Sequence, residues 1–129
     1  MVSKKSTDVI RVGVVGACGR MGATVCDAIV AADGLELVAV VDTQGAGRSV
    51  HGLTVAQELK ALADAHAQVV VDFTVASAAR VTLPWLALHG MHAVVGTTGF
   101  SDEMSHIKDN TYKYILCISI ISFSISFAV

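Results

Sequence analysis

Hydrophobic residues in this chain of 129 residues form two kinds of pattern that alternate along the sequence. Four short, continuous apolar runs are typical of strands buried on both faces, and they occupy 9–15, 35–41, 68–73 and 92–95. Between and after them, apolar residues recur every three or four positions, which predicts helices over 20–32, 56–65, 76–89 and 101–109. Alternating strands and helices predict an α/β fold with a doubly wound parallel sheet.

Particular residues refine the ends of these elements. Gly34 is suited to a left-handed C-cap after the first helix, and Ser101 is a suitable N-cap for the last one. Pro84 is predicted to kink the helix over 76–89 or to start a new first turn there. A polar loop is expected over 43–52, followed by a short extended piece at 53–55.

A glycine-rich turn, G-A-C-G-R-M-G at 16–22, directly follows the first predicted strand. Gly16, Gly19 and Gly22 lack the Cβ atoms that would block the turn, the approach of a phosphate and the packing of the next helix. The N-terminus of that helix offers unpaired N–H groups and a positive dipole end. The turn therefore predicts a Rossmann-like domain that holds the pyrophosphate of a dinucleotide.

Asp42 ends the second predicted strand, twenty residues after Gly22. At this separation a carboxylate meets the adenosine ribose of a dinucleotide and repels a 2′-phosphate, which favours NADH over NADPH. NADPH remains an alternative, because Arg20 could serve a 2′-phosphate and Arg48 is the first cation after Asp42. The competing interpretation makes Asp42 a solvated strand end.

Polar residues also follow the later strands, at the edge where doubly wound sheets bind ligands. Asp72 closes the third strand, where it either belongs to the site or caps nearby backbone N–H groups. Thr97 and Thr98 either offer donors to a nicotinamide carboxamide or substrate oxygen, or close a turn. Cys18 is interpreted as a tolerated small residue at the tip of the glycine turn.

Composition narrows the classes of function. A formal net charge of −2 gives no reason to expect nucleic acid or an anionic membrane as a partner. The five histidines and three cysteines have no metal-ligand spacing, and no nucleophile–base pair is visible, so no metal site is proposed. An odd cysteine count without a secretory signal predicts a reducing, cytoplasmic location.

Four segments together resemble the N-terminal part of 4-hydroxy-tetrahydrodipicolinate reductase (dihydrodipicolinate reductase), the NAD(P)H-dependent enzyme of lysine (diaminopimelate) biosynthesis. They are G-A-C-G-R-M-G at 16–22, V-V-D at 40–42, V-V-D-F-T at 70–74 and H-A-V-V-G-T-T-G-F at 92–100. The resemblance implies an NAD(P)H site made by Gly16, Ala17, Cys18, Gly19, Arg20, Met21, Asp42, Gly96, Thr97 and Thr98, and the preference for NADH within it rests on Asp42.

The resemblance also implies parts that this sequence does not show. Family members have a second domain that binds a cyclic imine, supplies a His/Lys acid pair in an H-H-x-x-K motif and assembles a tetramer. Neither that motif nor the family's A-P-N-F-like loop occurs here. No catalytic residue is therefore assigned, the chain alone is expected to be inactive, and a small-molecule substrate is expected only with a substrate domain.

The last twenty residues differ in composition from the rest. We predict a dinucleotide-binding domain over 1–109 and an atypical Ile/Ser/Phe tail over 110–129, explained best by a truncated or frame-altered reading of a longer gene. Residues 115–129 are too few to span a membrane, which argues against an anchor, whereas 114–118 could replace the next buried strand. The alternatives are a non-catalytic nucleotide-binding module, the N-terminal domain of another two-domain dehydrogenase, and a membrane-tethered protein.

Overall fold

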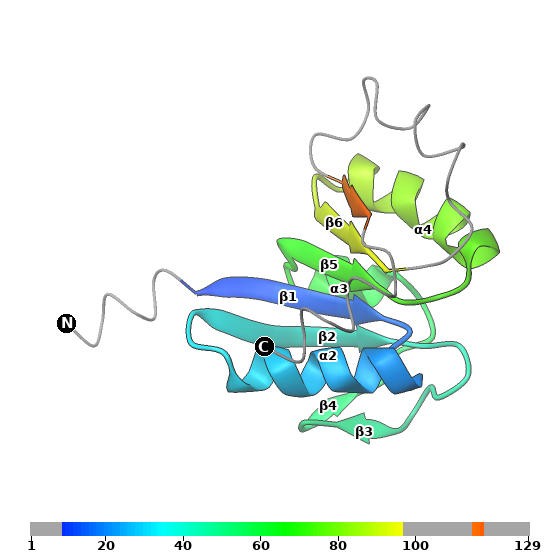
Figure 1. Ribbon diagram of the computed structural model, residues 1–129. Coiled ribbons are helices and arrows are strands. Elements are labelled where there is room, and N and C mark those ends of the chain that lie inside the picture. The colour runs from blue at the N-terminus through cyan, green and yellow to red at the C-terminus, as the bar shows by residue number, and fades with distance from the viewer. Residues whose placement is uncertain (1–8, 97–114, 118–129) are drawn as a thin grey trace.

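A parallel sheet in the order β2-β1-β5-β6-β7 forms the centre of the structure, a computed structural model that describes residues 9–96 and 115–117 (Figure 1). Its strands are β1 (Ile10–Val15), β2 (Leu35–Val41), β5 (Val69–Asp72), β6 (His92–Val95) and β7 (Ile115–Cys117). Every neighbouring pair is parallel. The predicted doubly wound sheet is confirmed, and β7 confirms the strand expected within 114–118.

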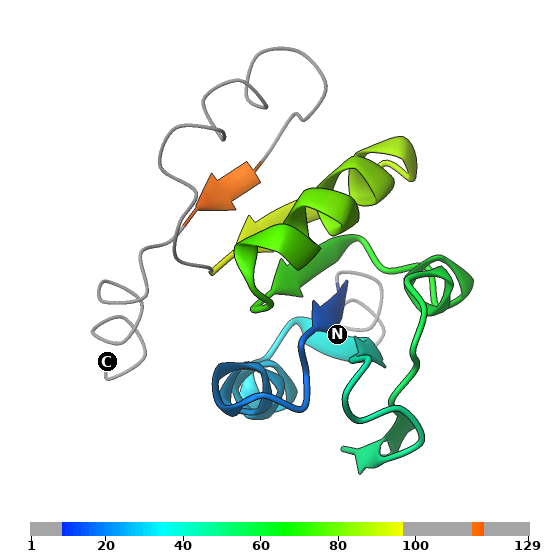
Figure 2. The same ribbon diagram turned by 90° about the vertical axis from the view of Figure 1, so that its right-hand side faces the viewer.

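Helices cover both faces of this sheet. Figures 1 and 2 show α2 (Arg20–Ala31) on one face, with α3 (Lys60–Asp64) and α4 (Ala76–Leu88) on the other. Side chains alternate accordingly along β1, where Val12 and Val14 pack in the cluster on the α2 side and Val15 packs on the α4 side. Because both faces are buried, the central parts of the strands are apolar on both sides, which explains the hydrophobic runs.

The register places the carboxyl ends of the strands in one row. Val15 pairs with Val41 on one side and with Asp72 on the other, and Asp72 also pairs with Val95. The chain runs from β1 to β2 in one direction and later returns to place β5 on the opposite side of β1. The strand order therefore reverses between β1 and β5, and ligands of such sheets bind at this switch point.

The segment after β2 differs from the prediction. The helix expected over 56–65 begins only at Lys60, because Ala56 forms a parallel bridge with Val41 and its N–H donates to the Val40 oxygen at 2.9 Å. Upstream lies a hairpin of β3 (Ser49–Val50) and β4 (Leu53–Thr54).

That hairpin turns at His51 and Gly52, whose φ angles of 48° and 81° are the left-handed values that a two-residue hairpin loop requires. Gly34 has the left-handed φ of +85° that was expected, but the C-cap of α2 is Ala32, which is extended and donates its N–H to the Ile29 oxygen at 3.2 Å. Helix α4 continues across Pro84 and does not restart there. The helix expected over 101–109, with Ser101, lies outside the described residues. Within the described part of the chain, no helix is both long and apolar enough to cross a membrane.

Candidate functional site

The glycine turn connects the end of β1 to the start of α2. Gly16 has a φ of +83°, and its N–H donates to the Val41 oxygen at 2.8 Å, so the turn is bonded to the neighbouring strand. A side chain at Gly16 would also come within 3.2 Å of the Phe73 backbone and of the Thr74 methyl group. This turn therefore needs glycine for its conformation and for the approach of the segment after β5.

The other two glycines have different surroundings. A Cβ atom on Gly22 would overlap the carbonyl oxygen of Gly16 and lie 2.9 Å from the Cα of Ala17. At Gly19 it would meet only the Gly16 oxygen, at an ordinary 3.5 Å. Gly22 thus lets α2 begin against the turn itself, whereas Gly19 keeps the outer side of the turn open.

The first turn of α2 leaves its backbone N–H groups available to an anion. Gly19 is the N-cap residue and has no side chain to bond these groups, and the first turn holds no acidic residue. Arg20 is exposed and Met21 half-buried. A helix N-terminus of this kind stabilises negative charge through its unpaired donors and dipole.

Asp42 follows β2 and bonds two separate segments. Its Oδ2 accepts the Cys18 N–H at 2.9 Å, and its Oδ1 accepts the Gln44 N–H at 2.9 Å. Asp42 is half-buried, and its carboxylate caps two backbone N–H groups at the end of β2. An ionised carboxylate has about four lone-pair positions, which leaves acceptor capacity for further donors.

A cavity of about 250 Å³ opens beside Gly16 and Asp42. Thr43 and Gln57 add polar groups to it, and Ala78 and Val81 of α4 add apolar wall. Sequence reasoning missed Gln57, Ala78 and Val81 as site residues. No local signal marks them, because only the fold brings α4 and the segment before α3 to the end of β2.

The D-F-T segment after β5 fills the space between the glycine turn and β6. Asp72 is fully buried, and its Oδ1 accepts the Thr74 N–H at 2.8 Å and the Thr74 hydroxyl at 2.5 Å, which confirms the capping interpretation. Burial raises the pKa of Asp72, against the lowering effect of both Thr74 bonds. A Cβ on Gly96 would lie 2.8 Å from Cδ1 of the Phe73 ring, so a side chain at this position requires that ring to move. Thr97 and Thr98 lie outside the described residues.

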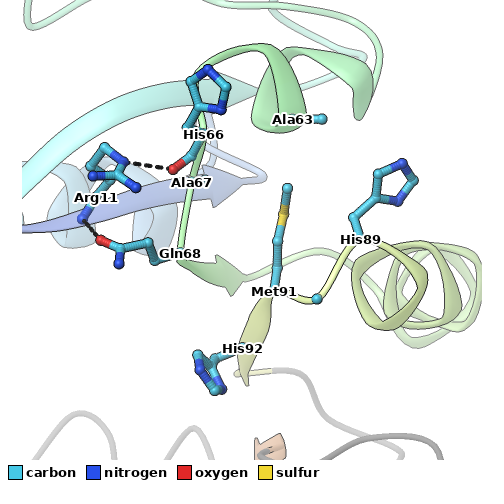
Figure 3. Close-up of a pocket in the computed structure, with 9 residues that line it drawn as sticks. Arg11, Ala63, His66, Ala67, Gln68, His89, Met91 and His92 are labelled. Atoms are coloured by element: carbon cyan, nitrogen blue, oxygen red, sulfur yellow. Dashed lines mark hydrogen bonds between the residues drawn. The ribbon is translucent and has the colours of Figure 1, made fainter.

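A larger hollow, of about 370 Å³, lies at the opposite edge, where the strands begin. Figure 3 shows Arg11 and His89 on opposite sides of it with Met91 between them. Arg11 donates from Nε to the His66 oxygen at 2.8 Å, just beyond α3, and the ring of His89 stacks on Trp85 at the end of α4. These side chains complement helix C-termini, whose partial negative charge disfavours an anionic ligand.

Arg11→Ala is therefore expected to lower the free energy of unfolding by about 1–2 kcal/mol, because the oxygen beyond α3 loses a charged donor. Urea unfolding measures the loss. Nucleotide affinity should not change, since Arg11 lies at the edge opposite Gly16 and Asp42. An unchanged unfolding midpoint would show that this bond contributes nothing.

The fold and the site together define a class of protein. A parallel sheet with a glycine turn and a carboxylate beside its switch point is a Rossmann-like domain. The family model described as "Dihydrodipicolinate reductase, N-terminus" matches residues 10–122, and the chain belongs to this family. The match includes β7 and so extends beyond residue 110.

Individual relatives agree with the family. The chain is 43% identical over 101 residues to "4-hydroxy-tetrahydrodipicolinate reductase" of Mycobacterium sp. (strain KMS). The aligned region covers 78% of this chain and 36% of the relative. It is 46% identical over 91 residues to the protein of that name from Nocardia farcinica (strain IFM 10152). That aligned region covers 70% of this chain and 32% of the relative.

A solved structure, dipicolinate-bound dihydrodipicolinate reductase from Paenisporosarcina sp. TG-14, is similar with a TM-score of 0.66 and 25% identity, over 77% of this chain and 41% of that one. The chain spans about a third of the length of these curated relatives.

Proposed function

We propose that this chain binds a nicotinamide dinucleotide and forms the cofactor-binding part of a 4-hydroxy-tetrahydrodipicolinate reductase. The observation that carries the proposal is the open glycine turn at the switch point, with the Asp42 carboxylate bonded to its tip through Cys18. Membership of the family supports the reaction class. The cofactor supplies a hydride, and the residues of this chain bind and orient it.

The pyrophosphate would lie against the glycine turn, from Gly16 to Met21. Gly19 leaves the outer side of the turn free of side chains, and the first-turn N–H groups of α2 have no capping side chain. This arrangement fits a doubly charged pyrophosphate without a cation in direct contact. Ala17 is buried beneath the turn and contributes packing and its backbone.

The adenosine end would lie at Asp42 and in the neighbouring cavity. Asp42 retains acceptor positions for the two ribose hydroxyls, and the cavity of about 250 Å³ has room for one planar ring system between apolar wall and polar rim. Val81 and Ala78 would contact the adenine faces. A negative carboxylate repels a 2′-phosphate, so we propose that NADH binds more tightly than NADPH.

The nicotinamide end would lie beyond β5 and β6. Gly96 ends β6 beside the ring of Phe73, which fixes the point where the chain leaves the sheet towards Thr97 and Thr98. We propose that backbone and hydroxyl donors of Thr97 and Thr98 hold the carboxamide, and that Gly96, whose N–H donates to the Asp72 oxygen at 2.9 Å, lies beside the nicotinamide without donating to it. The chain then contributes cofactor position and exclusion of water, while acid–base groups come from outside it.

Titration calorimetry with NADH and NADPH tests this function, and Asp42→Asn tests the ribose contact. Asparagine keeps one acceptor oxygen for the backbone but loses the charge, so NADH affinity is expected to fall about tenfold, equivalent to roughly 1.4 kcal/mol. NADPH affinity should fall less, because the repulsion of the 2′-phosphate is also removed. Asp33→Asn, at an exposed position beyond the other end of α2, is the matched control.

Two results would count against the proposal. Absence of binding by either nucleotide would contradict the dinucleotide site itself. An equal loss for NADH and NADPH in Asp42→Asn would contradict the role of Asp42 in choosing between them.

A further inference from the structure

One face of the sheet is covered over only part of its width by the described residues. Helix α2 packs against β1 and β2, and Figures 1 and 2 show it beside β5 and β6 and not over them. Burial alternates along these two strands as a result. In β5, Val69 and Val71 are half-buried and Val70 is fully buried, and in β6, Val94 is half-buried and Val95 fully buried. Both strands are therefore fully buried on one side alone.

The register identifies the less buried side as the one that carries α2. Val14 of β1 packs in the cluster on the α2 side, and it pairs with Val71, which in turn pairs with Val94. Paired residues of neighbouring strands point to the same side of a sheet. Phe73 packs partly against the same cluster. Val71, Phe73 and Val94 thus form an apolar surface beside α2, which we call the open face.

The chemistry of the open face requires an apolar cover. On this side β5 and β6 carry valines and His92, with no carboxylate, ammonium or guanidinium among them. Parallel strands are normally buried on both sides, because contact of their apolar side chains with water is unfavourable. A segment without charged residues therefore fits the open face best.

The dimensions of the open face suit a single segment of chain. Strands lie about 4.8 Å apart and rise about 3.3 Å per residue, so the face measures on the order of 10 Å by 10 Å. A stable dimer buries about 800 Å² on each partner, several times this area. One helix or extended segment, about 10 Å wide with its side chains, covers it. A segment of the same chain also has a high effective concentration at the face.

Residues 118–129, which lie outside the described residues, have the position and the composition of such a cover. They follow β7, which is paired with β6 through Val94 and Leu116, so the segment starts from the strand next to the open face. Their sequence is I-S-I-I-S-F-S-I-S-F-A-V and contains no charged residue. From Ile121 onward, Ile, Phe and Val alternate with Ser and Ala, which gives an extended chain one apolar side. Even as a helix the segment would measure about 18 Å, more than the width of the face.

We propose that residues 118–129 dock on the open face through the apolar side of their alternating pattern. The tail then covers β5 and β6 beside α2 and belongs to the core of the domain. Its contact with Phe73 also supports the ring that lies against Gly96. This inference does not depend on the proposed nucleotide site.

Thiol labelling of a cysteine on the open face tests the contact. In Val94→Cys the new thiol should react with a maleimide about tenfold more slowly than that of Val81→Cys, because the tail excludes the reagent. Val81 is the matched position, since it lies on α4 on the other side of the sheet and is 70% exposed. Mass spectrometry of the labelled peptides separates these positions from the native Cys18, Cys26 and Cys117.

Two sets of tail substitutions in the whole chain identify the cover. Serine at the three positions Phe123, Ile125 and Phe127 removes the apolar side and should raise the labelling rate at position 94 about tenfold. Alanine at Ser122, Ser124 and Ser126 changes the other side and should leave the rate unchanged. The rate at position 81 should be the same in both, which shows that the sheet and α4 remain folded.

The outcomes decide between covers. Slow labelling at position 94 that only the serine set abolishes supports the proposal. Equal rates at positions 94 and 81 in the otherwise unchanged chain would overturn it, and so would slow labelling that persists in the serine set. A rate at position 94 that falls with protein concentration would assign the face to a second copy instead.

A second measurement applies if the serine set unfolds the chain. Mild oxidation of the double variant Val94→Cys, Ile125→Cys should give an intramolecular disulfide between positions 94 and 125. Val81→Cys, Ile125→Cys is the matched control and should give none. A disulfide in neither variant, or in both to the same extent, would overturn the proposal.

Discussion

Gly22→Ala is expected to destabilise the domain by about 3 kcal/mol and to abolish nucleotide binding with it. The new methyl group would overlap the Gly16 oxygen and lie 2.7 Å from the Gly16 carbonyl carbon. Both are backbone atoms of the turn, so no rotamer change relieves the overlap. In an ordinary helix the same substitution stabilises by up to about 1 kcal/mol, which makes a loss of stability diagnostic of this packing.

Gly19→Ala is the matched comparison, three residues earlier. Its φ of −74° and ψ of 168° suit alanine, and the new Cβ would make only an ordinary contact. The fold should therefore persist, while NADH affinity falls about tenfold because a methyl group stands where a phosphate would approach. Urea unfolding and calorimetry measure the two effects. Wild-type stability in Gly22→Ala would contradict the packing argument, and wild-type NADH affinity in Gly19→Ala would contradict the phosphate position.

The elements that the sequence predicted well are those whose cause is local. β1, β2, β5 and β6 are mostly apolar because helices cover both faces of the sheet, so each run identified its strand directly. Their polar residues are Arg11, Glu36, Asp72 and His92. The turn at 16–22 is also local, since Gly16 needs a positive φ and Gly22 must pack against a backbone six residues away.

The start of α3 could not be predicted from its own residues. Residues 56–59 continue a helical pattern of apolar positions, but Ala56 bonds to β2 in a parallel bridge, and this tertiary contact excludes a helix there. The hairpin at 49–54 was missed for a related reason. His51 takes the left-handed conformation that usually marks glycine or asparagine, so the turn had no clear sequence signal.

The candidate site likewise has features that the sequence predicted and contacts that only the fold explains. The separation between Gly22 and Asp42 indicated a ribose-binding carboxylate, but not that its oxygens would bond Cys18 and Gln44. Those bonds depend on how the turn and the loop meet in space. Likewise, the closeness of Arg48 to Cys18 follows from a loop closure that no pattern of residues in the sequence encodes.

Asp72→Ala is expected to lower the free energy of unfolding by about 2–4 kcal/mol, because a buried group that holds two hydrogen bonds is removed. The buried carboxyl holds the segment after β5 through the Thr74 N–H and hydroxyl, and its removal leaves the N–H without its acceptor. Because that segment contacts Gly16 and positions Phe73 beside Gly96, the loss should also weaken NADH binding. Chemical unfolding and NADH titration of the same variant measure the two effects.

Asp72→Asn separates the charge of this group from its hydrogen bonds. The asparagine side chain would keep an oxygen for the Thr74 N–H but would carry no charge at any pH. In the wild type, burial raises the folded-state pKa of Asp72 above its unfolded value of about 3.9, so the folded protein binds the proton more tightly. This contribution to stability is fully present below the unfolded pKa and is lost as pH rises through the folded-state pKa.

The variant should therefore gain stability relative to the wild type as pH rises from about 4, up to a plateau above the folded-state pKa. The Oδ2 atom of Asp72, which is buried without a hydrogen-bond partner among the described residues, is the physical reason that ionisation is costly here. Urea unfolding at a series of pH values measures the difference, with exposed Asp64→Asn on α3 as the control. Parallel profiles for Asp72→Asn and wild type, or a wild type that gains on the variant with rising pH, would show that Asp72 is ionised in the folded protein at no cost.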